Sequence, residues 1–189
     1  MKKESTIAYI LRLSVTLLVI TSVIAGLLAG VNAITVDKIA AINAEKTRKA
    51  ISTVLESAEA PVALESFSDP TGLVKTVYAA EEGYAIQVAP SGFNGEINMM
   101  VGVSKDGQVL GFSIISHTET AGLGAVAAAS SSAGNAFRSQ FAGQSGSLAV
   151  TKDGGTIDAL TSATITSRAV TAGVNAALQC AENLNKEAA

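Results

Sequence analysis

The segment from Asp158 to Thr164 places hydroxyl side chains directly before a stretch with helical periodicity. A helix N-terminus offers free backbone N–H groups and the positive end of the helix dipole, and both favour a bound phosphate. We expect Thr164 to stand just ahead of this helix, with Thr166 or Ser167 as its cap. The segment thus predicts a threonine hydroxyl that carries a phosphoester. An ordinary Ser/Thr-rich turn before a helix is the alternative.

A second polar motif, His117–Gly124, follows a predicted strand and reads His-Thr-Glu-Thr-Ala-Gly-Leu-Gly. Loops at strand ends often carry function. Gly122 and Gly124 would let the backbone approach a flat ligand closely. Three side chains are candidates for hydrogen bonds to the polar edge of a ring: His117, Glu119 and Thr120. The alternative is a polar loop with a solvated histidine. A glycine-flanked turn at Gly92–Ile97 is a third, weaker candidate.

Composition excludes several other kinds of site. The chain of 189 residues has one histidine and one cysteine. An intramolecular disulfide, a four-thiolate iron–sulfur cluster and a histidine-rich metal site are therefore not expected. The net charge of −3 disfavours nucleic-acid binding, which normally needs a basic patch. Cys180 is predicted to be a small core residue. Redox chemistry in this chain would need an organic cofactor.

A membrane anchor is predicted near the N-terminus. The 24 residues from Leu13 to Val36 contain no charge, and about 20 apolar residues suffice to span a bilayer. The stretch is also longer than the roughly 7–15 apolar residues of a signal peptide, which favours an uncleaved anchor. Gly26 and Gly30 form a Gly-x-x-x-Gly pair that could pack against another helix. Basic residues flank both ends, and Arg12 at the membrane edge favours a cytoplasmic N-terminus.

The remaining pattern predicts an α+β fold on a stalk. The expected organisation is a tail at 1–12, a transmembrane helix at 13–36, a helical stalk at 37–60 that Pro61 ends, and a domain at 61–189. A mostly antiparallel sheet packed with helices, including a C-terminal helix, is expected there. An Asp-Gly turn at Asp106–Gly107 indicates a hairpin. The predicted strands are Leu73–Ala79, Gly83–Val88, Asn98–Val103, Val109–Ser116 and Leu148–Thr151.

Helices are expected in two further regions. The Ala/Ser-rich stretch Ala125–Phe141 is compatible with one or two short helices. In the C-terminal helix, apolar residues at three–four spacing form one face that should be buried. This face comprises Val170, Val174, Ala177, Leu178, Ala181 and Leu184.

The order of these features resembles the G subunits of Rnf electron-transport complexes. More broadly it is similar to the C subunits of sodium-pumping NADH:quinone reductases, which share an FMN-binding domain. The family motif His-Ser-Glu-Thr-Pro-Gly-Leu-Gly matches His117–Gly124, with Thr118 for Ser and Ala121 for Pro. The family attachment motif Asp-x-x-(Ser/Thr)-Gly-Ala-Thr matches Asp158–Thr164, with Ser162 for Gly. The resemblance covers essentially the whole chain, whose short length favours the Rnf family.

This resemblance implies a covalent flavin. A flavin transferase would cleave FAD and transfer FMN to the last threonine of the motif, Thr164, through a phosphodiester. The domain would lie outside the cytoplasm. It would pass electrons among subunits of an Rnf-type ferredoxin:NAD oxidoreductase that pumps Na⁺ or H⁺, and it would not be an independent catalyst. The residues that the resemblance places around FMN are His117, Thr118, Glu119, Thr120, Gly122, Leu123, Gly124, Thr161, Ser162, Ala163 and Thr166.

Other functions are compatible with parts of the pattern. One is a protein like the C subunits of sodium-pumping NADH:quinone reductases. Another is a cofactor-free, membrane-anchored assembly or binding subunit, which the low aromatic content of 4% would suit. A pilin-like scaffold is disfavoured, because its charge-bearing helix start is missing and the motif at 158–164 has no role in such a protein.

Overall fold

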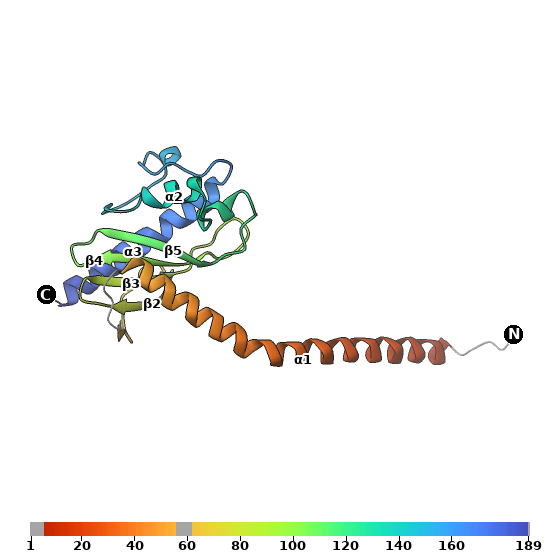
Figure 1. Ribbon diagram of the computed structural model, residues 1–189. Helices are drawn as coiled ribbons and strands as arrows, with labels where there is room; N and C mark the ends of the chain where they lie inside the picture. The colour runs from red at the N-terminus through yellow and green to blue at the C-terminus, as the bar shows by residue number, and fades with distance from the viewer. Residues whose placement is uncertain (1–5, 56–61, 189) are drawn as a thin grey trace. The chain divides into compact units, whose positions relative to one another are not determined.

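The computed structural model describes residues 6–55 and 62–188, coloured along the chain in Figure 1. The chain divides into two compact units, Met1–Ala44 and Glu45–Ala189. The expected helix end at Pro61 and the last residues of the predicted stalk lie outside the described residues.

The first unit is formed by the helix α1, which runs from Thr6 to Val54 and enters the second unit with its last residues. Its apolar part has a mean hydropathy of 2.3, and by length and composition it can cross a membrane. Threonine hydroxyls within it donate to carbonyls one turn earlier, as Thr16 does to Arg12 at 2.8 Å and Thr21 to Leu17 at 2.9 Å. Such bonds satisfy polar groups where water is excluded. The predicted transmembrane helix and stalk therefore form one continuous helix as far as Val54.

The second unit is built on a five-stranded antiparallel sheet in the order β1-β2-β3-β4-β5. Four strands agree with the predicted ones to within one residue, and the short first strand was not predicted. Their bounds are β1 Val62–Ala63, β2 Val74–Ala79, β3 Gly83–Val88, β4 Asn98–Ser104 and β5 Val109–Ser116. The α+β prediction is confirmed.

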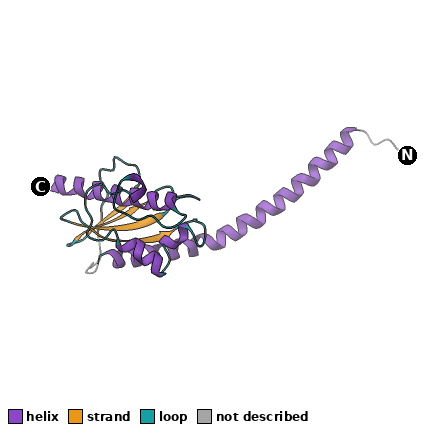
Figure 2. Ribbon diagram, turned by 90° about the horizontal axis from the view of Figure 1, so that it is seen from above, coloured by secondary structure: helices purple, strands orange, loops and turns teal. Residues whose placement is uncertain are grey.

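Helices cover both faces of this sheet, as Figure 2 shows. Side chains alternate between the two faces along each strand. Ile86 and Val88 of β3 belong to the main core with the helix α3, whereas Ala85 packs with Ile51 and Val54 from the end of α1. A Cβ at Gly102 of β4 would lie 2.5 Å from the Val54 carbonyl oxygen. Glycine at this position therefore allows the end of α1 to approach the sheet closely.

The C-terminal helix α3 extends from Thr164 to Ala188. Its predicted apolar face is buried against the sheet, and Cys180 is buried with it. The predicted cap at Thr166 or Ser167 was wrong, because the helix begins at Thr164 and both side chains turn inward. The Ser167 hydroxyl donates to the Ala163 carbonyl at 3.0 Å and accepts from the Leu160 N–H at 2.9 Å. Ser167 thus fastens the preceding loop to the helix.

Short elements connect β5 to α3. They are η1 Gly124–Ala127, α2 Ser132–Ser139 and η2 Thr151–Asp153. The predicted helical stretch is confirmed, but the strand predicted at Leu148–Thr151 was wrong. Val150 forms only an isolated bridge with Ile157, and the Asn175 side chain bonds both backbone groups of Leu148, at 2.9 and 2.8 Å. A helical side chain thereby supplies the hydrogen bonds that a neighbouring strand would have given.

Candidate functional site

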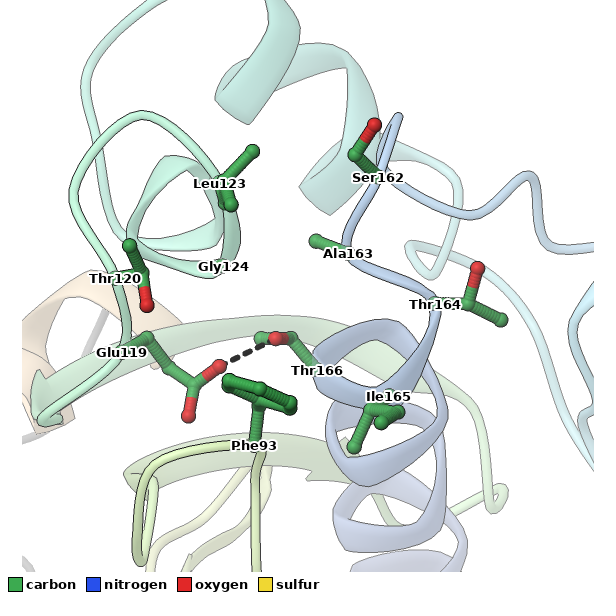
Figure 3. A pocket seen from close by; sticks show the side chains of 10 residues that line it. All are labelled: Phe93, Glu119, Thr120, Leu123, Gly124, Ser162, Ala163, Thr164, Ile165 and Thr166. Carbon is green, nitrogen blue, oxygen red and sulfur yellow. Dashed lines mark hydrogen bonds between the residues drawn. The ribbon is translucent and has the colours of Figure 1, made fainter.

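A cavity of about 300 Å³ lies where three segments of the second unit meet (Figure 3). One segment is the turn before β4, the second is the loop after β5, and the third is the start of α3. The lining residues are Phe93, Glu119, Thr120, Leu123, Gly124, Ser162, Ala163, Thr164, Ile165 and Thr166. The structure therefore brings together all three sequence motifs that were singled out as candidates for chemistry.

Glu119 joins these three segments through its carboxylate. The residue is only 8% exposed, and both carboxylate oxygens are hydrogen-bonded. Oε1 accepts from the Asn94 backbone N–H at 2.9 Å, and Oε2 accepts from the Thr166 hydroxyl, the contact drawn in Figure 3. Bonds to a charged group are stronger than neutral ones and are costly to lose when buried. Glu119 thus positions the walls of the cavity relative to one another.

A second pair of hydrogen bonds joins the turn at Asn94 to the loop at Thr118. The Asn94 side-chain amide donates to the Thr118 carbonyl at 2.8 Å, and the Thr118 hydroxyl donates to the Asn94 carbonyl at 2.8 Å. These reciprocal bonds fix Gly92–Ile97 beside the loop after β5. The turn thereby holds Phe93 at the cavity.

Two glycines allow the crowded packing around Glu119. A Cβ at Gly92 would lie 2.5 Å from Glu119 Oε1, and a Cβ at Gly124 would collide with both Glu119 and Thr166. The space next to Gly124 is therefore filled by protein. Gly122 has a φ of 76°, a backbone that glycine adopts without strain. In this structure the glycines serve the turn and the packing of the carboxylate.

The loop before α3 is a tight turn that is held at both ends. The Gln140 side chain bonds the Asp158 backbone, accepting from its N–H at 2.7 Å and donating to its carbonyl at 3.2 Å. Within the turn, the Ala163 N–H donates to the Leu160 carbonyl at 3.0 Å. Ser162 has a φ of 60°, the left-handed region that favours glycine. Position 162 is thus where a glycine would fit with less strain.

Thr164 is the first residue of α3, and its side chain is half-buried. The Lys152 ammonium of η2 donates to its hydroxyl oxygen at 3.1 Å. The adjacent Asp153 carboxylate accepts two bonds from the Arg168 guanidinium, at 2.7 and 2.6 Å. Hydrogen bonding to Arg168 lowers the pKa of Asp153, so this carboxylate stays ionised. The hydroxyl that was predicted to be modified therefore contacts one cation directly and lies near an ion pair.

The cavity contains eight of the twelve residues that the sequence singled out, and four lie outside its lining. His117 Nδ1 accepts from the Glu119 backbone N–H at 3.2 Å, and Thr118 bonds to Asn94. Gly122 lies in the turn, and Thr161 is exposed beside a different hollow next to α2. These four support the cavity or flank it, and their contact with a flavin stays a prediction.

Sequence reasoning missed three residues at this site, namely Phe93, Ile165 and Lys152. Phe93 and Ile165 line the cavity and are 66% and 50% exposed, and Leu123, which also lines it, is 42% exposed. Phe93 is the one aromatic residue in the glycine-flanked turn, which was a usable signal. Lys152 gave no signal, because it lies next to the segment that was predicted to be a strand. The exposed apolar rim is available for contact with a ligand or a partner.

Comparison with known proteins extends these observations. A family model described as FMN-binding domain matches residues 92–179, a range that includes all three motifs. The chain is 34% identical to the G subunit of the Na⁺-translocating ferredoxin:NAD⁺ oxidoreductase complex of Acetobacterium woodii, over 94% of each chain. It is 30% identical to the G subunit of the ion-translocating oxidoreductase complex of Methanosarcina acetivorans, over 89% of this chain and 93% of that protein. It is 43% identical to a proton-translocating counterpart of Clostridium ljungdahlii, over 56% of this chain and 59% of that protein.

Proposed function

The chain belongs to the family of G subunits of ion-translocating oxidoreductase complexes and contains an FMN-binding domain, and from this premise we propose that it is a membrane-anchored electron-transfer subunit with FMN linked to Thr164. Its complex would be an Rnf-type ferredoxin:NAD oxidoreductase. Relatives are named for sodium and for proton translocation, so the proposal covers Na⁺ or H⁺. The observation that carries the proposal is the position of Thr164, at the start of a helix and at the edge of the cavity.

The residues at the cavity suit both ends of FMN. Small-molecule sites usually measure about 300–1,000 Å³, so a cavity of about 300 Å³ suits part of a cofactor whose remainder stays exposed. Phe93, Leu123 and Ile165 offer an apolar surface to a flat ring. The Thr164 hydroxyl, the first amides of α3 and the Lys152 ammonium suit a phosphate. The groups present thus fit both a ring and an anion at this cavity.

Bound FMN would supply reversible acceptance and release of electrons at this site. The protein would bind and orient the ring and adjust its potential by the surroundings. Because both Glu119 oxygens are already bonded, we assign Glu119 and Thr166 to holding the walls in place. Contacts with the ring fall to four other residues that line the cavity, Phe93, Thr120, Leu123 and Ile165.

Attachment of the cofactor is a transfer reaction. The Thr164 oxygen would attack the flavin-side phosphorus of FAD, forming a P–O bond to the threonine. The phosphoanhydride bond would break, AMP would leave, and the hydroxyl proton would pass to the transferase or solvent. This transfer needs no oxidant: FAD is the donor of the group and a flavin transferase is the catalyst. A covalent link would retain the cofactor in a domain on the extracytoplasmic side of the membrane.

The proposal is tested by co-expressing the full-length chain with a flavin transferase. We expect wild-type protein to fluoresce as flavin in a denaturing gel and to gain the mass of FMN less one water. Thr164→Ala should lose both signals, whereas Thr161→Ala, three residues earlier, should retain them. A wild-type chain without added flavin mass would instead favour a cofactor-free assembly role.

A further inference from the structure

We propose that Lys152 is a positioning residue for the phosphodiester at Thr164, and that the Asp153–Arg168 ion pair holds it there. This inference rests on the proposed function, since it concerns the same site. The Lys152 ammonium would neutralise the phosphate and fix its orientation at the start of α3. Nothing in the motif around Thr164 itself points to Lys152, which lies 12 residues earlier in the chain.

The contact itself is direct. The Lys152 ammonium donates to Thr164 Oγ1 at 3.1 Å, the oxygen that would bridge the threonine to phosphorus. Lysine is a compact point charge with three donors, so one ammonium can bond this oxygen and neighbouring phosphate oxygens at once. The side chain is exposed, and a free lysine of this kind usually loses much entropy when it is held in one geometry. The backbone that carries Lys152 must therefore be rigid if the contact is to hold a phosphate in one position.

The turn that carries Lys152 is anchored on both sides. Within it, the Asp153 N–H donates to the Val150 carbonyl at 2.8 Å, and the Thr151 N–H donates to the Ile157 carbonyl at 2.8 Å. Toward α3, the Arg168 guanidinium bonds both Asp153 oxygens, a planar fork that favours one orientation. Arg168 is one helical turn after Thr164, so the pair fixes η2 beside the helix start.

The distribution of charge assigns different roles to the two cations. Arg168 and Asp153 neutralise each other, because the guanidinium fork already has a carboxylate partner. Lys152 bonds a neutral hydroxyl, so its positive charge is not balanced by this contact. A phosphodiester at Thr164 would place a negative charge beside that ammonium. The phosphate would thus complete a charge pair whose cation is already in place.

The test uses full-length protein in detergent, purified transferase and FAD. The variants are Lys152→Met, which removes the charge, and Lys152→Arg, which retains it. Lys186→Met is the matched control, because Lys186 lies at the far end of α3 in an exposed ion pair with Glu182. We expect Lys152→Met to slow FMN incorporation about tenfold or more, the change that corresponds to losing a charged hydrogen bond. Lys152→Arg should recover most of the rate, and Lys186→Met should match wild type.

A second readout separates positioning from docking of the transferase. The phosphorus-31 resonance of each loaded protein reports the surroundings of the phosphodiester directly. We expect it to shift in Lys152→Met and to stay in place in Lys186→Met. Suppose that wild-type protein takes up FMN, and that Lys152→Met either incorporates it at a rate within twofold of wild type or shows an unchanged resonance. This result would overturn the inference about Lys152 and leave the proposed function standing. Wild-type protein that takes up no FMN would overturn the proposed function.

Discussion

Glu119 and Thr166 are 47 residues apart in the chain, and their side chains are hydrogen-bonded to each other in the wall of the cavity. One lies in the loop after β5 and the other in the first turn of α3. Both are almost fully buried, at 8% and 2% exposure. The bond therefore links the loop after β5 to the start of α3 in the wall of the cavity.

Replacing Thr166 with valine keeps the shape of the side chain and removes the donor to Glu119. A buried carboxylate that loses one partner should lower the free energy of unfolding by about 1–3 kcal/mol. Thermal unfolding of the detergent-solubilised chain measures this loss. Thr53→Val is the control, because Thr53 is exposed and bonds the Lys49 carbonyl of its own helix. A melting temperature for Thr166→Val equal to that of the control would show that the bond contributes nothing.

Ser162 has a backbone that favours glycine, with a φ of 60°. Ser162→Gly should raise the free energy of unfolding by about 0.5–1 kcal/mol, since relief of the left-handed strain exceeds the entropy that glycine loses on folding. Ser162→Ala retains the Cβ and should give no such gain, which separates backbone strain from loss of the hydroxyl. Urea unfolding of the three proteins measures the difference. A gain of equal size in both variants would contradict the backbone explanation.

Cys180 should make stability depend on pH in the alkaline range. Burial, followed by the charges of Asp69 and Glu187, raises the pKa of its thiol from 9.0 to about 11. A raised folded-state pKa gives a stability contribution that is complete below pH 9.0 and is lost as pH rises through about 11. Relative to Cys180→Ala, wild-type protein should therefore lose stability across this window. If the stabilities of the two proteins changed with pH in parallel, the raised pKa assigned to Cys180 would be contradicted.

A labelling experiment can determine on which side of the membrane the domain lies. Ser145→Cys places an exposed thiol on the domain, whereas the native Cys180 is buried and should stay unlabelled. We expect a membrane-impermeant maleimide to label Ser145→Cys in intact spheroplasts and not to label Lys3→Cys in the N-terminal tail. Labelling of Lys3→Cys alone would place the domain in the cytoplasm.

Much of the fold was predictable because its elements carry local signals. The strand Gly83–Val88 and the hairpin at Asp106–Gly107 follow from β-branched residues and turn chemistry, and both are present. The apolar face of α3 follows from three–four spacing. The structure of Leu148–Thr151 could not be predicted from local signals. The hydrogen bonds of Leu148 come from the side chain of Asn175, which lies 27 residues later in the chain on α3.

The candidate site was predictable only in part, for a related reason. Thr164 and Glu119 lie in motifs that a single stretch of sequence displays, and both line the cavity. Phe93 reaches the cavity through bonds between Asn94 and Thr118, and Lys152 reaches Thr164 through a turn that Arg168 anchors. Both contacts depend on tertiary packing. The aromatic Phe93 in its glycine-flanked turn was a usable local signal, whereas the sequence around Lys152 carries none.

The central claim is that Thr164 carries the flavin, and peptide mass spectrometry tests it most directly. Trypsin cuts after Lys152 and Arg168, which releases the segment from Asp153 to Arg168 as one peptide. After co-expression with a flavin transferase, this peptide should gain the mass of FMN less one water, and fragmentation should place that mass on Thr164. An unmodified peptide under those conditions, or a flavin located on Thr161, Ser162 or Thr166, would contradict the account.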